Sequence, residues 1–333
     1  CAKTGSMKPL VFASPGWLRN NRRSSAQSRA SLTRTQRGGM DQFRNIGLIG
    51  RLGIGRVVDT LKRLKRFLLD TGHTVILEDA VADLLPGHQQ QVCSRKMMGE
   101  ICDLVIVVGG DGSLLGAARA LCRYNIPVLG VNRGGLGFLT DIPPDELEQK
   151  VGDVLAGQYM VETRFLLDAF VRRGEEQLGT SEALNDVLLH PGKSARMIEF
   201  ELYVDGQFVY SQKSDGLIVA TPTGSTAYSL SAGGPIMHPK LDAVVLVPMF
   251  PHTLSSRPIV VDGNSELKII ISKQSGIYPQ VSCDGQVHMS CAPGDSITIR
   301  KKPQKLRLLH PLDHNFYAIC RSKLGWSSRL TEQ

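Results

Sequence analysis

The sequence predicts an α/β domain with a doubly wound parallel sheet, followed by an all-β domain. In the first half, short apolar runs alternate with segments whose apolar residues recur at helical spacing, the pattern of a parallel sheet with crossover helices. In the second half, short apolar runs are separated by turn residues. The 34 glycines and the 6% aromatic content favour the close backbone approaches of such folds over a coiled coil.

The elements of the first half follow from their apolar spacing. The run from Val57 to Leu68 predicts a helix that ends before Gly72. Asp103–Val108 is continuously apolar, which is typical of a parallel strand buried on both faces. After it, a helix is expected from Ser113 to about Tyr124. The remaining strands are predicted at Asn45–Gly50, His73–Glu78 and Pro127–Val131.

From about Arg164 the pattern changes to that of antiparallel strands. Two Asp-Gly pairs, in Val204–Gln207 and in Cys283–Gln286, lie between strand-like runs and predict hairpins. One helix is expected, from about Gly224 to Gly233. The predicted strands are Phe165–Val171, Ala183–Leu189, Ile198–Val204, Leu217–Ala220, Ala243–Val247, Leu267–Ile271, Ser296–Arg300 and Lys305–Leu309.

The net charge of +8 belongs to the first 39 residues, which hold eight basic residues and no acid. The rest of the chain has 31 basic and 31 acidic residues, so its charge does not predict a nucleic-acid partner. Residues 1–39 are expected to form a disordered basic leader, or sequence upstream of a start at Met40. Their Arg- and Ser-rich, acid-free composition is also that of an organellar transit peptide, which stays an alternative.

Cysteine and histidine spacing predicts no metal site. The seven cysteines are scattered without a C-x-x-C pair, as expected of buried thiols in a reducing cytoplasm. Four histidines that adjoin proline are interpreted as structural: His190, His238, His252 and His310. The longest apolar runs are far shorter than the ~20 residues of a membrane helix, so no membrane contact is expected.

The strongest local feature is the segment Gly109-Gly110-Asp111-Gly112, directly after a buried strand and before a helix. Ligands of open α/β sheets bind at this edge. Glycines let phosphate oxygens reach backbone N–H groups, and the helix N-terminus favours anions. Asp111 is then free to bind a metal ion or accept a proton, or it is only a helix cap. No P-loop motif and no complete dinucleotide fingerprint occurs, so the site must be built differently.

Three further segments are candidates. Asp215 precedes a short strand and the hydroxyl-rich loop Thr221–Ser229, whose side chains either cap a helix or bind a ribose or phosphate. Asn185 and Asp186 form a polar pair within an apolar run, as a satisfied bulge or a ligand contact. The glycine-rich turn Asn132–Thr140 follows another strand and is weak evidence by itself.

In this order, GGDG, the Asn-Asp pair, SDG and TPTGSTAYSLSAGGP resemble the NAD kinases, most closely the bacterial ATP-dependent type. The resemblance runs from about Asn45 to Trp326 and leaves out the leader. It implies a C-terminal β-sandwich-like domain and a tail that packs back on the first domain. The expected domains are therefore 40–160, an α/β domain with GGDG; 161–310, a β-rich dinucleotide-binding domain; and 311–333, the tail.

The resemblance also implies the roles of particular residues. Asp111 matches the catalytic aspartate, with Gly109, Gly110 and Gly112 in its phosphate loop. Asp186 stands where many members have Glu, which shortens its reach, and Lys213 where many have Arg. Arg196 matches a residue that contacts a dinucleotide bound mainly by a neighbouring subunit. The implied NAD contacts are Asp111, Gly112, Asn185, Asp186, Arg196, Lys213, Asp215, Thr226, Ala227, Tyr228, Ser229, Leu230, Ser231 and Gln286.

The implied reaction is transfer of the γ-phosphoryl group of ATP, with Mg²⁺, to the 2′-hydroxyl of the adenosine ribose of NAD. The implied protein is a cytoplasmic homo-oligomer, a dimer or a tetramer, with NAD and ATP as its ligands. Two other functions stay open: a lipid or sugar kinase that shares GGDG, and a non-catalytic module that senses NAD(H).

Overall fold

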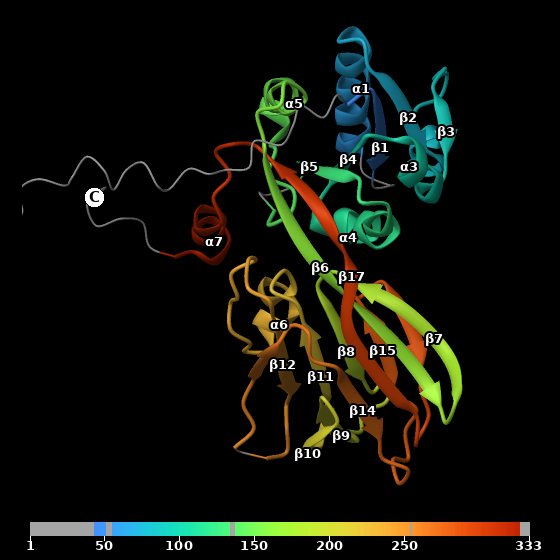
Figure 1. Cartoon of the computed structure of the whole chain (residues 1–333), viewed down its shortest axis with the longest axis vertical. Helices are drawn as coiled ribbons and strands as arrows, with labels where there is room; N and C mark the ends of the chain where they lie inside the picture. Colours follow the sequence, from blue (N-terminus) through green and yellow to red (C-terminus); the bar gives the residue numbers. More distant parts are fainter. Residues whose placement is uncertain (1–42, 51–54, 134–136, 254, 327–333) are drawn as a thin grey trace, which may run out of the picture. The chain divides into compact units, whose positions relative to one another are not determined.

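The computed structural model describes residues 43–50, 55–133, 137–253 and 255–326 (Figure 1). The predicted leader, residues 1–39, lies outside the described residues, as does the end of the predicted tail after Trp326. In the part of the chain that is described, no helix has both the length and the apolar character needed to cross a membrane.

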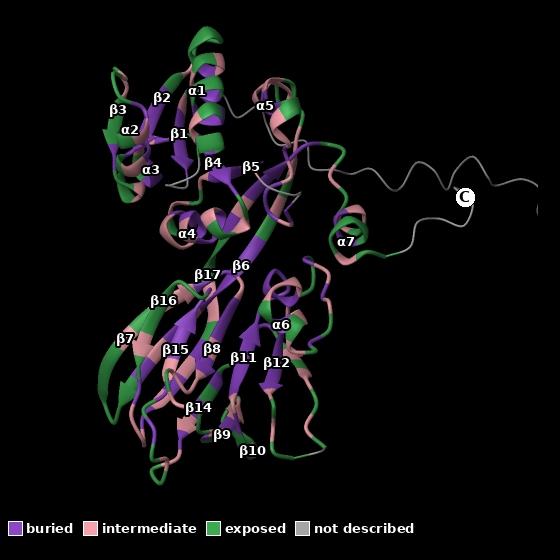
Figure 2. Ribbon diagram, turned by 180° about the vertical axis from the view of Figure 1, so that it is seen from behind, coloured by how far each residue is buried: buried purple, intermediate pink, exposed green. Residues whose placement is uncertain are grey.

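Five parallel strands form the first part of a large sheet, in the order β3-β2-β1-β4-β5. Strands β4 and β5 are buried throughout (Figure 2), as the continuous apolar runs predict. The strands are β1 (Asn45–Gly50), β2 (Thr74–Glu78), β3 (Gln91–Cys93), β4 (Leu104–Gly109) and β5 (Pro127–Asn132).

Helices cover both faces of these strands, which confirms the predicted doubly wound arrangement. On one face, Leu61 of α1 and Val151 of α5 belong to a core with Leu48 of β1. On the other face, Met98 of α3 and Leu114 of α4 pack with buried residues of β4. The helices are α1 (Gly55–Asp70), α2 (Asp79–Leu84), α3 (Arg95–Ile101), α4 (Asp111–Leu121) and α5 (Leu147–Leu155), with short 3₁₀ turns η1 (Cys122–Tyr124) and η2 (Pro144–Glu146).

The same sheet continues into the second half of the chain through two long strands, β6 (Met160–Arg173) and β17 (Ser296–His310). β17 pairs in parallel with β5 and antiparallel with β6. Figure 1 shows these strands side by side, running from the α/β part into the β-rich part. A single sheet therefore crosses residue 160, and the domain boundary predicted there stays a prediction. The other strands of this sheet are β7 (Glu176–Ala183), β9 (Ile198–Val204), β10 (Gln207–Ser214) and β14 (Leu267–Ile271).

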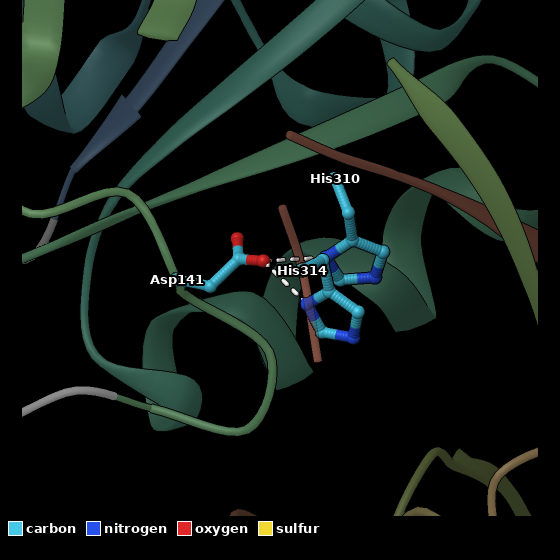
Figure 3. Close-up of side chains that lie close together, drawn as sticks. All are labelled: Asp141, His310 and His314. Carbon is cyan, nitrogen blue, oxygen red and sulfur yellow. Dashed lines mark hydrogen bonds and ion pairs between the residues drawn. The ribbon is translucent and has the colours of Figure 1, made fainter. Parts of the chain in front are cut away.

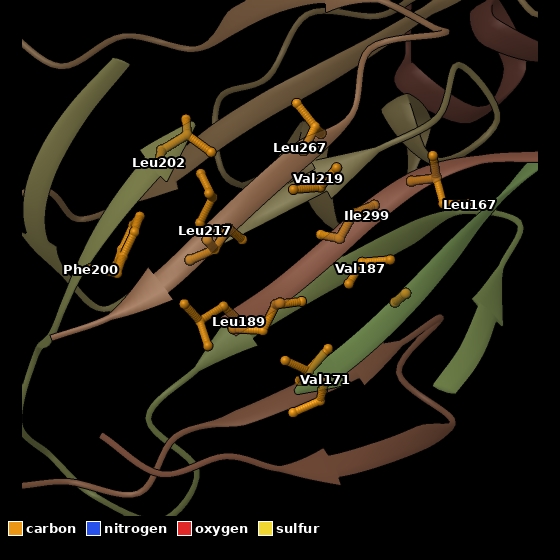
Figure 4. Packing of buried hydrophobic residues seen from close by; sticks show 14 of the residues in the cluster. Leu167, Val171, Val187, Leu189, Phe200, Leu202, Leu217, Val219, Leu267 and Ile299 are labelled. Atoms are coloured by element: carbon orange, nitrogen blue, oxygen red, sulfur yellow. The ribbon is translucent and has the colours of Figure 1, made fainter. Parts of the chain in front are cut away.

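A second, antiparallel sheet of six strands faces this part of the first one, with the order β13-β12-β11-β8-β15-β16. Phe200 and Ile299 of the first sheet share a hydrophobic core with Leu189 and Val219 of the second (Figure 4). This packing confirms the β-sandwich-like domain. The strands are β8 (Asp186–His190), β11 (Gly216–Ala220), β12 (Ala243–Met249), β13 (Ile259–Asp262), β15 (Gln280–Cys283) and β16 (Val287–Ser290).

Both predicted hairpin turns occur. Asp205 and Gly206 join β9 to β10, and Asp284 and Gly285 join β15 to β16, each residue with positive φ as this tight turn requires.

Three expectations for the β-rich half are wrong in detail. The runs Ser296–Arg300 and Lys305–Leu309 form one strand, because β17 continues along β6 past a register irregularity between Lys301 and Lys305. The run Ala183–Leu189 is divided, because β7 ends at Ala183 and β8 begins only at Asp186. The helix expected at 224–233 consists of the 3₁₀ turn η3 (Gly224–Thr226) and α6 (Tyr228–Ser231), with Ala227 in a non-helical conformation between them.

The C-terminal helix α7 (Phe316–Leu324) follows β17 and contacts both halves of the chain. The ring of Phe316 lies 6.2 Å from that of Phe138 and 5.2 Å from that of His238. Just before the helix, the amine of Lys150 on α5 lies 2.5 Å from Asp313.

Candidate functional site

The GGDG segment lies where the sequence places it, at the carboxyl end of β4. Gly109 ends the strand, Gly110 is the N-cap, and α4 begins at Asp111, two residues earlier than predicted. Gly110 and Gly112 are exposed, and a Cβ on Gly110 would meet no atom within 4 Å. The first turn of α4 therefore presents backbone N–H groups to open space at this edge of the sheet.

The sequence left open whether the Asp111 carboxylate is a free group or a helix cap. In the structure it is neither. It accepts hydrogen bonds from the backbone N–H groups of Phe138 (2.9 Å) and Leu139 (3.0 Å) and from the hydroxyl of Thr140 (3.2 Å). Gly137 permits this approach, because a Cβ there would lie 2.2 Å from the Asp111 Oδ1. The glycine-rich turn, which was weak evidence by itself, thus holds the position of Asp111.

Asn185 and Asp186 are held by a residue that the sequence did not assign to the site, Asp284. Its buried carboxylate accepts hydrogen bonds from the backbone N–H groups of Leu184 (3.2 Å) and Asn185 (2.7 Å). Arg119, on the helix that GGDG opens, forms an ion pair with the same carboxylate. The pair predicted at Asn185 and Asp186 is therefore connected through Asp284 to the GGDG helix.

The carboxyl group of Asp186 is almost fully buried, with 6% of the residue exposed. Burial, and the nearby charge of Asp284, raise its pKa from the ordinary 3.8 to about 7. Burial also raises the pKa of Asp284, against the effect of its backbone donors and Arg119.

Gln286, predicted as a ligand contact, connects the same hairpin to the GGDG loop. Its side-chain amide donates to the backbone oxygen of Gly112 (2.9 Å) and its oxygen accepts from Arg119. Gln286 also lines a cavity of about 460 Å³ beside the first turn of α4. The other lining residues are Gly50, Ala80, Arg95, Gly112, Ser113 and Gly116.

The hydroxyl-rich loop packs directly against Asn185. The N–H of Thr221 donates to the Asn185 backbone oxygen (2.9 Å), and a Cβ on Gly224 would lie 2.1 Å from that oxygen. Several hydroxyls serve the loop itself: Thr221 Oγ1 donates to Leu184 O (2.6 Å), and Ser225 Oγ accepts from Met237 N (2.9 Å). Contacts within the protein thus account for the hydroxyls of Thr221 and Ser225, whereas the Ser229 hydroxyl is buried without a hydrogen-bond partner among the described residues.

Tyr228 and Asp215 border cavities on the β-rich half. Tyr228 is 45% exposed and lines a cavity of about 300 Å³ together with Asp215. Asp215 also lines a cavity of about 400 Å³ with Lys213 and Arg196. Of the other predicted contacts, Ser231 is exposed, Thr226, Ala227 and Leu230 are half-buried and Ser229 is buried.

Among the described residues, one group of histidines and carboxylates comes close enough to suggest a metal centre: Asp141, His310 and His314, with their polar atoms within 4.8 Å of one another. These atoms are already joined by hydrogen bonds, from His310 Nδ1 (2.9 Å) and His314 Nδ1 (2.6 Å) to Asp141 Oδ2. The sequence analysis missed this group, although His314 follows His310 by four residues. The prediction that the chain has no metal site of its own stays a prediction.

Comparison with known proteins assigns both halves to one family. Residues 46–159 match the model of the ATP-NAD kinase N-terminal domain, and residues 184–311 match that of the ATP-NAD kinase C-terminal domain. A protein named NAD kinase from Pseudomonas aeruginosa is 75% identical over 291 residues, which cover 87% of this chain and 99% of that protein. A Pseudomonas putida protein of the same name is also 75% identical, over 87% of this chain and 98% of the relative.

Solved structures agree with this assignment. The crystal structure of an NAD kinase from Archaeoglobus fulgidus in complex with ATP has a TM-score of 0.65 and 28% identity, covering 84% of this chain and 99% of that one. The fold is also that of yeast NADH kinase complexed with NADH (TM-score 0.78, 24% identity, 87% and 90% coverage). The two matching domain models and the 75% identical relatives together show that this chain belongs to the NAD kinase family.

Proposed function

We propose that this protein transfers the γ-phosphoryl group of ATP to the 2′-hydroxyl of the adenosine ribose of NAD, which gives NADP and ADP. Relatives that are 75% identical over nearly their whole length carry the name NAD kinase. The observation that carries the proposal is the meeting of GGDG, the Asn-Asp pair and the hydroxyl-rich loop through Asp284 and Asn185.

Asp111 is the proposed catalytic residue. A ribose hydroxyl is a weak nucleophile, and a positioned carboxylate that accepts its proton or orients it by a hydrogen bond accelerates the attack on phosphorus. Three donors fix the Asp111 carboxylate at the edge of the sheet, which supports such a role. The ordering of Asp111 before the substrate arrives lowers the entropic cost of reaching the reactive geometry.

NAD is proposed to lie along the residues that border the loop and the β-rich cavities. Asn185 and Asp186 would hold the ribose next to Asp111, and Gly112 and Gln286 would contact the dinucleotide from the GGDG side. Asp215 and Tyr228 line one cavity, in which a carboxylate can accept from the adenine amino group and an aromatic ring can stack. Thr226, Ala227, Ser229, Leu230 and Ser231 complete this wall in the proposal, and Lys213 provides positive charge near it.

The phosphates of ATP are proposed to occupy the cavity of about 460 Å³ beside α4. Ser113 lines it, and the Ser113 Oγ is buried without a hydrogen-bond partner among the described residues, which supports a phosphate or Mg²⁺ there. Gly109, Gly110 and Gly112 leave the backbone N–H groups accessible to phosphate oxygens. Mg²⁺ bound with the phosphates would neutralise negative charge during phosphoryl transfer.

We further propose that the protein is a cytoplasmic homo-oligomer, a dimer or a tetramer. Arg196 is exposed beside the cavity that it shares with Asp215, where it would reach a dinucleotide bound mainly by a neighbouring subunit. The six cysteines of the described residues are free and buried, as expected in a reducing compartment.

The test is incubation of the purified chain with ATP, Mg²⁺ and NAD, followed by measurement of NADP. NADP formation that requires ATP, and that is lost in Asp111→Asn, is the expected result. Consumption of ATP with a lipid or sugar and not with NAD would indicate another kinase that shares GGDG. Binding of NAD(H) without any turnover would indicate a sensing module.

A further inference from the structure

A buried group of polar side chains lies at the end of β17, and the proposed chemistry does not use it. Asp141 Oδ2 accepts from the Nδ1 atoms of His310 and His314, at 2.9 and 2.6 Å (Figure 3). The two imidazole rings are stacked, with centroids 3.9 Å apart. His310 is 1% exposed and ends β17, whereas His314 precedes α7.

His310 contacts a carboxylate at each ring nitrogen. Its Nδ1 faces Asp141, and its Nε2 lies 3.3 Å from Oε2 of Glu162 on β6. Because carboxylates only accept, these two neighbours favour a proton on each ring nitrogen and thus the imidazolium form of His310. Burial opposes this charge, but the interactions with Asp141 and Glu162 raise the pKa of His310 above its ordinary value.

Arg164 lies two residues after Glu162 on β6, and its side chain connects Glu162 to the hydroxyl-rich loop. Its Nη2 donates to the same Glu162 oxygen (2.6 Å), and its Nη1 donates to Thr223 Oγ1 (3.1 Å). Arg164 is 4% exposed, and burial lowers the pKa of its guanidinium, although the charges of Glu162 and Asp111 partly oppose this effect. The planar guanidinium makes both contacts at once, which a lysine amine at the same place would not do.

At its other end, this series of contacts leads back to Asp111. Asp141 directly follows Thr140, whose hydroxyl donates to the Asp111 carboxylate, and the N–H groups of Phe138 and Leu139 donate there as well. One segment thus holds Asp111 on one side and His310 on the other. The connected residues therefore begin at Asp111 and Thr140 and end at Thr223. Between them lie Asp141, His310, Glu162 and Arg164.

We propose that His310, Glu162 and Arg164 are positioning residues that fix the Thr221–Tyr228 loop relative to Asp111. This inference rests on the proposed function, in which the loop holds NAD and Asp111 acts on its ribose. A buried ion pair adds little net stability compared with apolar residues of the same volume, so stability alone gives weak grounds for these charges. The contacts of these residues with the Asp111-binding segment and with the Thr221–Tyr228 loop give a reason for the presence of the charges.

The test uses Arg164→Lys and Thr223→Val, assayed with ATP, Mg²⁺ and a range of NAD concentrations. The valine variant removes only the hydroxyl that Arg164 contacts, whereas the lysine variant keeps the charge. Loss of one hydrogen bond to a charged group predicts about a tenfold increase in KM for NAD in each variant, which corresponds to about 1.4 kcal/mol. Because both changes break the same contact, the double variant should lose little more than either single variant.

Arg173→Lys is the matched control. Arg173 lies on the same strand, and its guanidinium forms a two-point ion pair with the buried Asp295 (2.8 and 3.1 Å), outside this series of contacts. This variant should keep the KM for NAD of the parent, whatever happens to its melting temperature. Glu162→Gln should raise the KM for NAD. Glu162→Asp, which keeps the carboxylate, should raise it less.

Each result separates positioning from mere stability. A raised KM in Arg164→Lys and Thr223→Val, with the control unchanged, supports the proposal. Kinetic constants within twofold of the parent in Thr223→Val, or a purely additive double variant, would overturn it, even if Arg164→Lys does not fold. If the parent itself forms no NADP, the proposed function fails instead, so the two failures are distinguishable.

Discussion

Asparagine in place of Asp186 tests whether burial controls the charge of this carboxyl group. Asn has nearly the same size and stays neutral at all pH values. The side chain of Asp186 is buried at the start of β8, and its pKa of about 7 lies well above the ordinary value of 3.8. At low pH the parent carries a protonated, neutral Asp186, so the two proteins should then have similar stabilities.

The sign and size of the effect follow from this difference in pKa. Because the folded protein binds the proton of Asp186 more tightly than the unfolded chain does, the stability from this group is complete below about pH 4 and is lost as the pH rises toward about 7. The interval from 3.8 to about 7 corresponds to about 4 kcal/mol. More than half of this loss falls between about pH 5 and pH 8.

The assay is urea unfolding of the parent and of Asp186→Asn at several pH values from 5 to 8. The variant should become progressively more stable relative to the parent as the pH rises. Asp59→Asn, at an exposed position on α1, is the control for a change of charge alone. A stability difference that does not change with pH would show that Asp186 ionises as it does in water, and the argument from burial would then be wrong.

Four other predictions concern catalysis, the leader, assembly and substrate choice. Asp111→Asn should reduce turnover by more than ~10²-fold while NAD binding and the melting temperature stay close to those of the parent; near-normal turnover would exclude Asp111 from the mechanism. A chain that begins at Met40 should keep its melting temperature and activity, because residues 1–39 offer little apolar surface to bury; a clear drop in either would contradict this. Sedimentation should show an oligomer under assay conditions, and a fully active monomer would refute the role of Arg196. The hypoxanthine analogue of NAD should be a poorer substrate by ~1–3 kcal/mol in kcat/KM, because it offers no amino group to Asp215; Asp215→Ala should reduce this preference, and equal values for both dinucleotides in the parent would refute the contact.

The parts that the sequence predicts well are those in which neighbouring residues decide the outcome. β4, the three glycines and the start of α4 lie within one stretch, so the run of buried residues and the glycine pattern suffice to place them. The two Asp-Gly hairpins are equally local, because positive φ at both turn residues favours this pair. The division of the expected strand at Ala183–Leu189 is not local, since Asp284 captures the backbone N–H groups of Leu184 and Asn185 from about a hundred residues away.

The groups that fix the site come from parts of the chain that no short window includes. The partners of Asp111 lie at Phe138, Leu139 and Thr140, beyond an intervening helix and strand. Arg119 and Asp284 are separated by 165 residues. Asp284 was visible in the sequence only as a turn residue, since its acceptor role depends on the pairing of β15 with β8, which brings the hairpin beside Asn185.

Residues that contact a ligand and residues that hold them in place therefore leave different patterns in the sequence. A motif that touches a ligand needs particular residue types at short spacing, because glycines, hydroxyls and carboxylates must converge within a few ångströms. A supporting residue needs only to arrive at the right place after folding, and it can come from any strand that the topology brings there. In this chain β6 brings Arg164 to Thr223 and β17 brings His310 to Asp141, because both strands run from the α/β part into the sandwich. Asp111 and Thr223 are thus connected through residues of two paired strands, and a change in the register of β6 against β17 would move Arg164 relative to His310.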